Sequence, residues 1–399
     1  MSKYLVMATA IGWSDIVPPN GFANRPSGGG ASNSNPAGLG TAVPDVEIET
    51  TPEHYNLIAG DPSCEGWTRR YDDPGVVALR GELAAHNGIP GLEPVEPHQV
   101  ERAVQLFYRD GFVVVSGALH GERLADLRAA TDRVVGEIVE VDPDHSIGGG
   151  AGGLPHRYSF GSTSATRHRL HEPAWANVTD LETTTPILTA IFGSENYVVG
   201  GGGGDVALPG AIEYQGLHSD NIWTEPFDPV GEINMREMPV PVVTINFPMV
   251  ALTTENGPIR QIPGTQRCMD PIPTLTDEPL AMKRSTLCPV PAGSALIRDN
   301  RTWHGGTPNL SRNVRSLPNI EYFAPWFRSE IIERTMPYDV WRALSPHAQR
   351  ICRFVAAGPG EVVLGAGFTH PRARVREQHL QQALESLGPR RAAEYIARH

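Results

Sequence analysis

The spacing of apolar residues changes along the chain and separates helical from extended segments. In EPHQVERAVQLFYRD, apolar side chains recur every three or four positions, the period of a helix with one buried face. Pro97 suits the start of this helix and Gly111 its end, and the run FVVV directly after it predicts a strand. A second amphipathic helix is predicted between Leu124 and Ile138, before the loop SIGGGAGG, for which we expect no cofactor role.

From about 194 to 326 the pattern changes to short β-branched and apolar runs separated by Pro and Gly. These runs are NYVVGG, VALPGAIEYQGLH, VPVVTINFPMVAL, PIRQIPG, GSALIRD and SLPNIEYFA. Many short strands with turn residues between them predict a sandwich or barrel. After 327 helical spacing returns, with one helix beginning at Ser345 and Pro346 and another between Val375 and Leu387. The predicted fold is therefore mainly β with flanking helices on the outside.

The first part of the chain differs in composition from the rest. Residues 18–46 are rich in Gly, Pro, Ser and Asn and carry too little apolar surface for a core. We expect 1–95 to be a Gly/Pro-rich arm that packs on the core, with a homodimer contact as its alternative role. Residues 96–399 are expected to form one domain, with a β core at about 194–326 and C-terminal helices at 327–399.

The amino-acid composition of the chain limits which kinds of molecule the protein is expected to bind. A chain of 399 residues with 40% hydrophobic residues can bury a sizeable core, and its formal net charge of -12 argues against nucleic-acid binding. Four scattered cysteines without CxxC spacing suit reduced thiols in a cytoplasm. No stretch approaches the ~20 apolar residues of a membrane span. We expect a cytoplasmic protein that acts on a small molecule, with neither nucleic acid nor a membrane as partner.

The segment QGLHSDNIW places an imidazole and a carboxylate two positions apart, at His218 and Asp220. On a strand, residues two apart point to the same face, so both side chains can reach one point. His304, shortly after the apolar run ALI, can supply a third ligand. Two imidazoles and one carboxylate are the facial triad of non-heme iron(II) oxygenases. Zinc on the same three residues, or a polar pair without metal, are the alternatives.

Four segments, in order, resemble the phytanoyl-CoA dioxygenase-like family of iron(II)/2-oxoglutarate oxygenases. They are PGAIEYQGLHSD, TTENGPIRQIPGTQR, PVPAGSALIRDNRTWHGG and HGGTPNLSRNVRS, and the likeness covers roughly 97–326. The resemblance implies a double-stranded β-helix of the jelly-roll, cupin-like type. It also implies Fe(II) on His218, Asp220 and His304, with 2-oxoglutarate and O2 as cosubstrates.

The resemblance further implies where 2-oxoglutarate lies. It assigns the distal carboxylate to Arg315 and further cosubstrate contacts to Gln215, Asn246 and Thr307, although Asn246 stands where a relative carries a tryptophan. Arg312 falls in the turn TPNLSRN and is expected to face water. Arg315 instead opens a strand, which we expect to run beside the strand of the metal histidines.

The reaction implied is oxidation, in the simplest case hydroxylation, of an unactivated carbon of a small molecule, with release of succinate and CO2. Desaturation, epoxidation and ring rearrangement use the same site, whereas the retained Asp220 argues against halogenation. A zinc cupin-like hydrolase or isomerase, and a non-catalytic binder, are alternatives from other classes. Substrate contacts are expected from Trp223, Arg157 and Tyr158, the last two in a run rich in His and Arg. The five glycines from Gly200 predict a bulge or a close backbone approach, or leave room for substrate.

Overall fold

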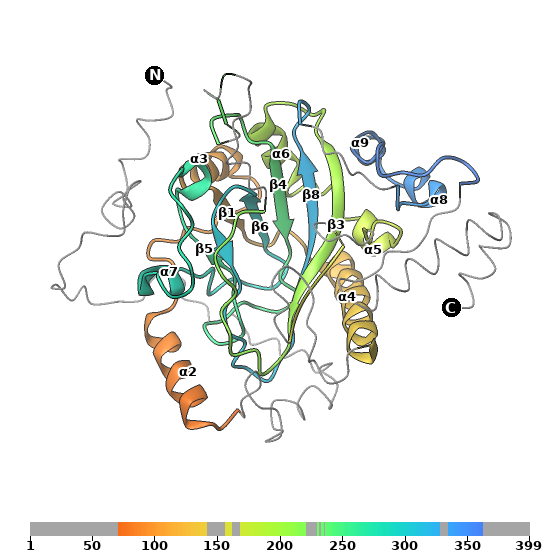
Figure 1. Ribbon diagram of the computed structural model, residues 1–399. Coiled ribbons are helices and arrows are strands. Elements are labelled where there is room, and N and C mark those ends of the chain that lie inside the picture. Colours follow the sequence, from red (N-terminus) through yellow and green to blue (C-terminus); the bar gives the residue numbers. More distant parts are fainter. Residues whose placement is uncertain are drawn as a thin grey trace.

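The computed structural model describes residues 71–141, 156–161, 168–220, 230, 233–234, 236–327 and 334–361 (Figure 1). Most of the predicted arm, the SIGGGAGG loop and the helix predicted after Val375 therefore lie outside the described residues. In chain order the elements are α2 (Pro74–His86), α3 (Val100–Asp110), β1 (Phe112–Val115), α4 (Gly121–Val141), β2 (Arg157–Phe160), α5 (Pro173–Ala176), α6 (Thr185–Phe192), β3 (Val198–Ala207), β4 (Val242–Asn246), β5 (Arg260–Gln261), the 3-10 turn η1 (Thr265–Arg267), α7 (Leu280–Lys283), β6 (Ala295–Asp299), β7 (His304–Gly305), β8 (Arg315–Phe323), α8 (Tyr338–Arg342) and α9 (Pro346–Ile351).

The elements with the clearest periodicity form where the sequence predicts them. Helix α3 ends at Gly111, which adopts φ +85, a left-handed conformation that glycine reaches without a steric penalty. Strand β1 follows at once, and α4 covers the second predicted helix. At α9, the side chain of Ser345 accepts a hydrogen bond from the backbone N–H of Ala348 at 3.0 Å and caps the helix.

The principal sheet is antiparallel and has six strands in the order β1-β6-β4-β8-β3-β2. Most strands of this sheet that follow each other in sequence are not hydrogen-bonded to each other, because long connections separate them; β2 with β3 and β4 with β6 are the exceptions. Strand β8 lies centrally, paired with β4 on one side and β3 on the other (Figure 1). This mainly antiparallel sheet with helices agrees with the predicted fold class.

The two faces of this sheet bury different groups. One face, which we call the helix-covered face, packs Ile245, Ile320 and Tyr322 against residues of α3, α4, α5 and α6. On the other face, the inner face, Leu296 and Leu317 pack with residues next to the two-stranded sheet of β5 and β7. Because side chains alternate along a strand, Arg315, Asn319 and Glu321 of β8 belong to the inner face with Leu317.

The structure corrects the predicted position of the strand that Arg315 opens. Strand β8 begins at Arg315 as expected, but it pairs with β3 and β4 and not with the segments that carry the histidines. His304 lies in β7, which pairs with β5, and His218 forms an isolated bridge with His304 instead of belonging to a regular strand. The prediction failed because apolar spacing identifies strands without identifying their partners.

The glycines of β3 allow neighbouring side chains to approach its backbone closely. The pairing with β8 shifts register between Val199 and Gly201, which is a bulge. A Cβ at Gly200 would lie 2.3 Å from the ring of Phe323, and a Cβ at Gly201 would lie 2.4 Å from Nδ1 of His168. Close approach of neighbouring groups thus accounts for glycine at these positions.

Helix α2, which falls within the predicted arm 1–95, packs on the body of the protein. Val76 and Leu83 pack with Leu310, and the guanidinium of Arg80 donates to the carbonyl of Leu310 at 3.0 Å. The limits of the arm and of the domain remain predictions. Among the helices that the structure describes, none is long and apolar enough to cross a membrane.

Candidate metal centre

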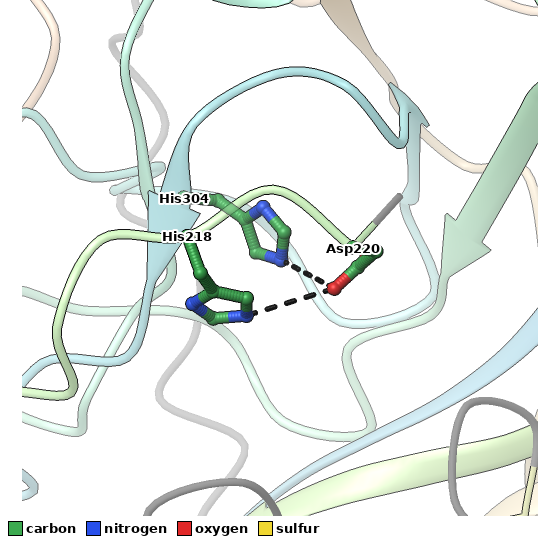
Figure 2. Close-up of side chains that lie close together, drawn as sticks. All are labelled: His218, Asp220 and His304. Carbon is green, nitrogen blue, oxygen red and sulfur yellow. Dashed lines mark ion pairs between the residues drawn. The ribbon is translucent and has the colours of Figure 1, made fainter. Parts of the chain in front are cut away.

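Three predicted ligands meet at one point. One ligand atom each of His218, Asp220 and His304 lie within 4.8 Å of one another (Figure 2). Oδ1 of Asp220 lies 3.6 Å from Nε2 of His218 and 3.3 Å from Nε2 of His304. Figure 2 shows both rings directed toward the carboxylate, each from a different segment of the chain. Two imidazoles and a carboxylate on one side of a point are the donor set of a facial triad.

Backbone hydrogen bonds fix the segments that carry the ligands. The N–H of His218 donates to the carbonyl of His304 at 2.9 Å, and the N–H of His304 donates to the carbonyl of His218 at 2.9 Å. The N–H of Asp220 donates to the carbonyl of Asn300 at 3.0 Å. A reciprocal pair of this kind places the two side chains directly opposite each other. Two of these main-chain contacts join residues 86 positions apart and the third joins residues 80 positions apart, so the backbone holds the two segments together.

The orientation of each ring leaves one nitrogen available for a metal. Nδ1 of His218 lies 3.0 Å from the carbonyl of Gly216, and Nδ1 of His304 lies 2.9 Å from the carbonyl of Thr302. A carbonyl only accepts, so Nδ1 is the protonated nitrogen of each neutral ring and Nε2 keeps its lone pair. Burial lowers the pKa of His304 to about 4, which favours that neutral form.

Arg298, on the inner face of β6, holds the second oxygen of the carboxylate. Its Nη2 donates to Oδ2 of Asp220 at 2.5 Å, while Oδ1 points toward the histidines. Burial alone would raise the pKa of Asp220, but its interactions with the His304 ring and with the Arg298 guanidinium outweigh that effect and hold the pKa well below its usual value. The carboxylate is thus ionised and held with one oxygen toward the ligand cluster.

The region that carries the metal centre matches a known protein family. A family model described as phytanoyl-CoA dioxygenase (PhyH) matches residues 107–317, more than half of the 399 residues. The chain belongs to the phytanoyl-CoA dioxygenase family. As a family member it is a 2-oxoglutarate-dependent non-heme iron dioxygenase, and iron and 2-oxoglutarate are its cofactors.

Several solved structures share similarity with this family member. AviO1 from Streptomyces viridochromogenes Tue57 has 19% sequence identity and a TM-score of 0.40, covering 58% of this chain and 97% of that one. SnoN, a non-heme alpha-ketoglutarate-dependent epimerase from nogalamycin biosynthesis, has 17% identity and a TM-score of 0.41, covering 57% and 81%. SnoK, a carbocyclase from the same biosynthesis, has 18% identity and a TM-score of 0.37, covering 58% and 90%. Similarity at this level does not define the reaction of this chain.

Arg315 of this phytanoyl-CoA dioxygenase family member is buried on the inner face, with 1% of its surface exposed. Its Nε donates to the carbonyl of Gly257 at 2.9 Å, and its Nη1 has no hydrogen-bond partner among the described residues. Arg312 differs as the sequence predicts, because it is exposed and stacks over the ring of Tyr71 at 4.4 Å.

Arg157 lies on the same face and close to Arg315. Each is paired across the sheet with Ala207, one from β2 and the other from β8. Nη2 of Arg157 donates to the carbonyl of Thr307 at 2.7 Å. Burial, together with the charge of Arg315, lowers the pKa of Arg157 to about 9. In the described part of the chain neither guanidinium forms an ion pair, whereas the buried Arg260 and Arg301 pair with Glu278 and Asp299.

The other predicted cosubstrate residues lie around this region. Oε1 of Gln215 accepts from the N–H of Gly306 at 3.1 Å, and the hydroxyl of Thr307 donates to the carbonyl of Pro258 at 2.6 Å. Both side chains therefore support the backbone near His304. Asn246 is buried on β4 opposite Asn319, and its Oδ1 has no hydrogen-bond partner among the described residues.

Of the three predicted substrate contacts, Arg157 lies on the inner face and Tyr158 does not. Tyr158 lies on the helix-covered face of β2, 1% exposed in the apolar core, and so points away from Arg157 and the inner face. Trp223 lies outside the described residues. Sequence reasoning missed Arg298 and Glu321, which reach the inner face from β6 and β8. Their signal was a charged residue next to apolar positions of a buried strand, with Arg298 directly after Ile297 and Glu321 between Ile320 and Tyr322.

Proposed function

We propose that this protein uses iron held by His218, Asp220 and His304 to couple the oxidative decarboxylation of 2-oxoglutarate to oxidation of a small-molecule substrate. Hydroxylation of an unactivated carbon, with release of succinate and CO2, is the reaction we assign. The convergence of the three ligand atoms within 4.8 Å is the observation that carries this proposal. The donor set suits ferrous iron, and three protein ligands leave other coordination positions for substrates.

The orientation of the ligands supports a preformed site. Both Nε2 lone pairs face the carboxylate, and the carbonyls of Gly216 and Thr302 fix the tautomers. Arg298 restrains Asp220 so that Oδ1 remains on the side of the histidines. Loaded with Fe(II) and 2-oxoglutarate, such a centre activates O2. The part of the protein is to hold the ligands, orient the cosubstrate and exclude water.

We assign the distal carboxylate of 2-oxoglutarate to Arg315, with the charge of Arg157 available to the same anion. Burial of two guanidiniums without a carboxylate partner is unfavourable by several kcal/mol per ion. A bound dicarboxylate would supply the missing negative charge and accept a pair of parallel hydrogen bonds from a planar guanidinium. Gln215, Asn246 and Thr307 remain assigned to the walls of the cosubstrate site.

We further propose that the two sheets are the faces of a double-stranded β-helix of the jelly-roll, cupin-like type. Support comes from the antiparallel order of the large sheet and from the β5 and β7 pair on its inner side. In this arrangement the inner face of the large sheet, with Arg315 and Arg298, encloses the site. The bridge between His218 and His304 would then continue the smaller sheet toward the metal centre.

The test is anaerobic titration of the purified protein with Fe(II) and then 2-oxoglutarate. We expect about one iron per chain and a weak visible charge-transfer band that appears only when the cosubstrate is added. On admission of O2, succinate should accumulate, and a screen of small molecules scored by succinate release should identify substrates. Preferential retention of zinc, with no band and no succinate, would support the zinc hydrolase or isomerase instead and exclude the proposed reaction.

A further inference from the structure

A row of polar residues crosses the inner face of the large sheet next to the metal centre. Arg298 of β6 is paired with Thr244 of β4, Thr244 with Glu321 of β8, and Glu321 with Gly201 of β3. Residues directly opposite each other in antiparallel strands direct their side chains to the same face. Arg298 at one end of the row contacts the ligand Asp220. The row therefore leads from the metal centre across three further strands.

Glu321 is buried in the middle of this row, with 5% of its surface exposed. Among the described residues its carboxyl group has no hydrogen-bond or ion-pair partner. Thr244 beside it is already engaged, because its hydroxyl donates to Oδ1 of Asn300 at 2.6 Å. Burial, together with the charge of Asp220, raises the pKa of Glu321 to about 8. A buried carboxyl group without a partner is unfavourable, so the site is suited to an additional polar ligand.

The side chain of His168 occupies the position in this row where Gly201 has no side chain. A Cβ on Gly201 would lie 2.4 Å from Nδ1 of His168, so the imidazole covers that position directly beside Glu321. The ring is held there because the next residue, Arg169, donates its backbone N–H to the carbonyl of Gly202 at 2.7 Å. His168 is 6% exposed, and its buried Nδ1 has no partner among the described residues.

We propose that Glu321 and His168 form a substrate-binding site that hydrogen-bonds a hydroxyl group of the substrate and presents a neighbouring carbon to the metal centre. The two polar groups are adjacent and lack hydrogen-bond partners among the described residues at the Glu321 carboxyl group and at Nδ1 of His168. They lie on the face that carries Arg298, whose guanidinium contacts Asp220. The proposal deepens the proposed function and rests on it, because the metal centre supplies the reaction.

The charges around the site select the chemical class of ligand. Asp205 lies on the same face of β3, so the negative charges of Asp220 and Asp205 disfavour a carboxylate or phosphate at this position. Burial lowers the pKa of His168 to about 4, which keeps the imidazole neutral. A hydroxyl group both donates and accepts, so it can serve a neutral imidazole and a carboxylic acid at once. A neutral, hydroxyl-bearing substrate is therefore the class that fits.

The test uses cis-1,2-cyclohexanediol as the probe, with cyclohexylamine and cyclohexanecarboxylate as matched compounds of positive and negative charge. The full chain is loaded with Mn(II), which takes the place of iron, and with 2-oxoglutarate, and the paramagnetic relaxation of probe protons is measured. We expect faster relaxation of the diol and little effect on the two charged compounds. Glu321→Leu should weaken diol binding about fivefold or more, as for loss of one hydrogen bond of about 1 kcal/mol.

The controls separate this site from the metal centre and from folding. Glu195→Leu, at an exposed carboxylate with 68% of its side chain accessible, should bind the diol as the wild type does. Glu321→Gln, which keeps a polar group, should retain part of the affinity. Relaxation of the 2-oxoglutarate protons by Mn(II) should be the same in all variants. If those protons are unaffected even in the wild type, the proposed function itself fails, and the substrate site fails with it.

Two results would overturn the substrate site alone. One is normal relaxation of 2-oxoglutarate with no relaxation of the diol, or with equal diol binding by the wild type and Glu321→Leu. The other is preferential binding of cyclohexylamine, which would mean that Glu321 is ionised and recognises a cation. Diol binding that Glu321→Leu weakens and Glu195→Leu leaves unchanged establishes the site.

Discussion

Truncation of Arg315 to alanine removes the guanidinium of a residue that is 1% exposed; among the described residues this guanidinium donates one hydrogen bond, to the carbonyl of Gly257 at 2.9 Å. Its charge has no carboxylate partner among the described residues, and Nη1 has no hydrogen-bond partner there. If the distal carboxylate of 2-oxoglutarate binds at this position, it meets a desolvated, preorganised cation. The substitution should therefore weaken cosubstrate binding strongly while leaving the metal ligands in place.

The expected loss of 2-oxoglutarate affinity depends on how deeply the arginine is buried. Removal of one partner of a desolvated, hydrogen-bonded charge pair costs about 2 to 5 kcal/mol, and the lower value already corresponds to about a thirtyfold rise in Kd. An exposed ion pair contributes under about 1 kcal/mol, or roughly fivefold. Arg312 is the matched control, since it is an exposed arginine three positions earlier that stacks on Tyr71. The two outcomes are far enough apart to be distinguished in one titration.

The assay is anaerobic titration of the Fe(II) protein with 2-oxoglutarate, followed by the visible charge-transfer band, with iron content measured in parallel. We expect Arg315→Ala to raise the cosubstrate Kd by about thirtyfold or more, Arg315→Lys to raise it less, and Arg312→Ala to change it little. Weak binding by Arg312→Ala together with normal binding by Arg315→Ala would place the anchor at Arg312. Normal binding by both variants would refute the cosubstrate site on the inner face.

Three further predictions concern the metal centre and the fold. His304→Ala should lose iron on dialysis because it lacks one of three ligands, whereas His168→Ala should keep it; equal iron content in both would refute the ligand assignment. Asp220→Ala should abolish hydroxylation of an identified substrate and give at most a trace of chlorinated product in chloride buffer. Efficient chlorination by the wild-type protein would instead show that Asp220 is not a metal ligand. Gly111→Ala should lower the free energy of unfolding, measured by urea denaturation, by roughly 1 to 3 kcal/mol. The reason is that φ is +85 at Gly111 and a Cβ there would lie 2.3 Å from Oγ1 of Thr302. An unchanged denaturation midpoint would contradict that steric argument.

Local signals in the sequence predicted the local structure well. Helix α3 and strand β1 follow the apolar periodicity that ends at Gly111, and Ser345 caps α9 as its residue type favours. The predicted ligands His218, Asp220 and His304 converge, because the motifs that carry them belong to a family whose model matches the chain. Each of these signals depends on residues close together in sequence or on a motif of fixed spacing.

The remaining features depend on which strands become neighbours, and apolar spacing does not contain that information. Arg298 and Thr244 are 54 positions apart, and Thr244 and Glu321 are 77 apart, yet the register places all three side by side. The strand of Arg315 likewise pairs with β3 and β4, and not with the segments that form the bridge between His218 and His304. A charged residue inside an apolar strand such as ALIRD does signal an unusual inner face, because burial of a charge is unfavourable without a partner. The partner, Asp220, becomes evident only when the sheet brings the two segments together, which is why the substrate site could be inferred from the structure and not from the sequence.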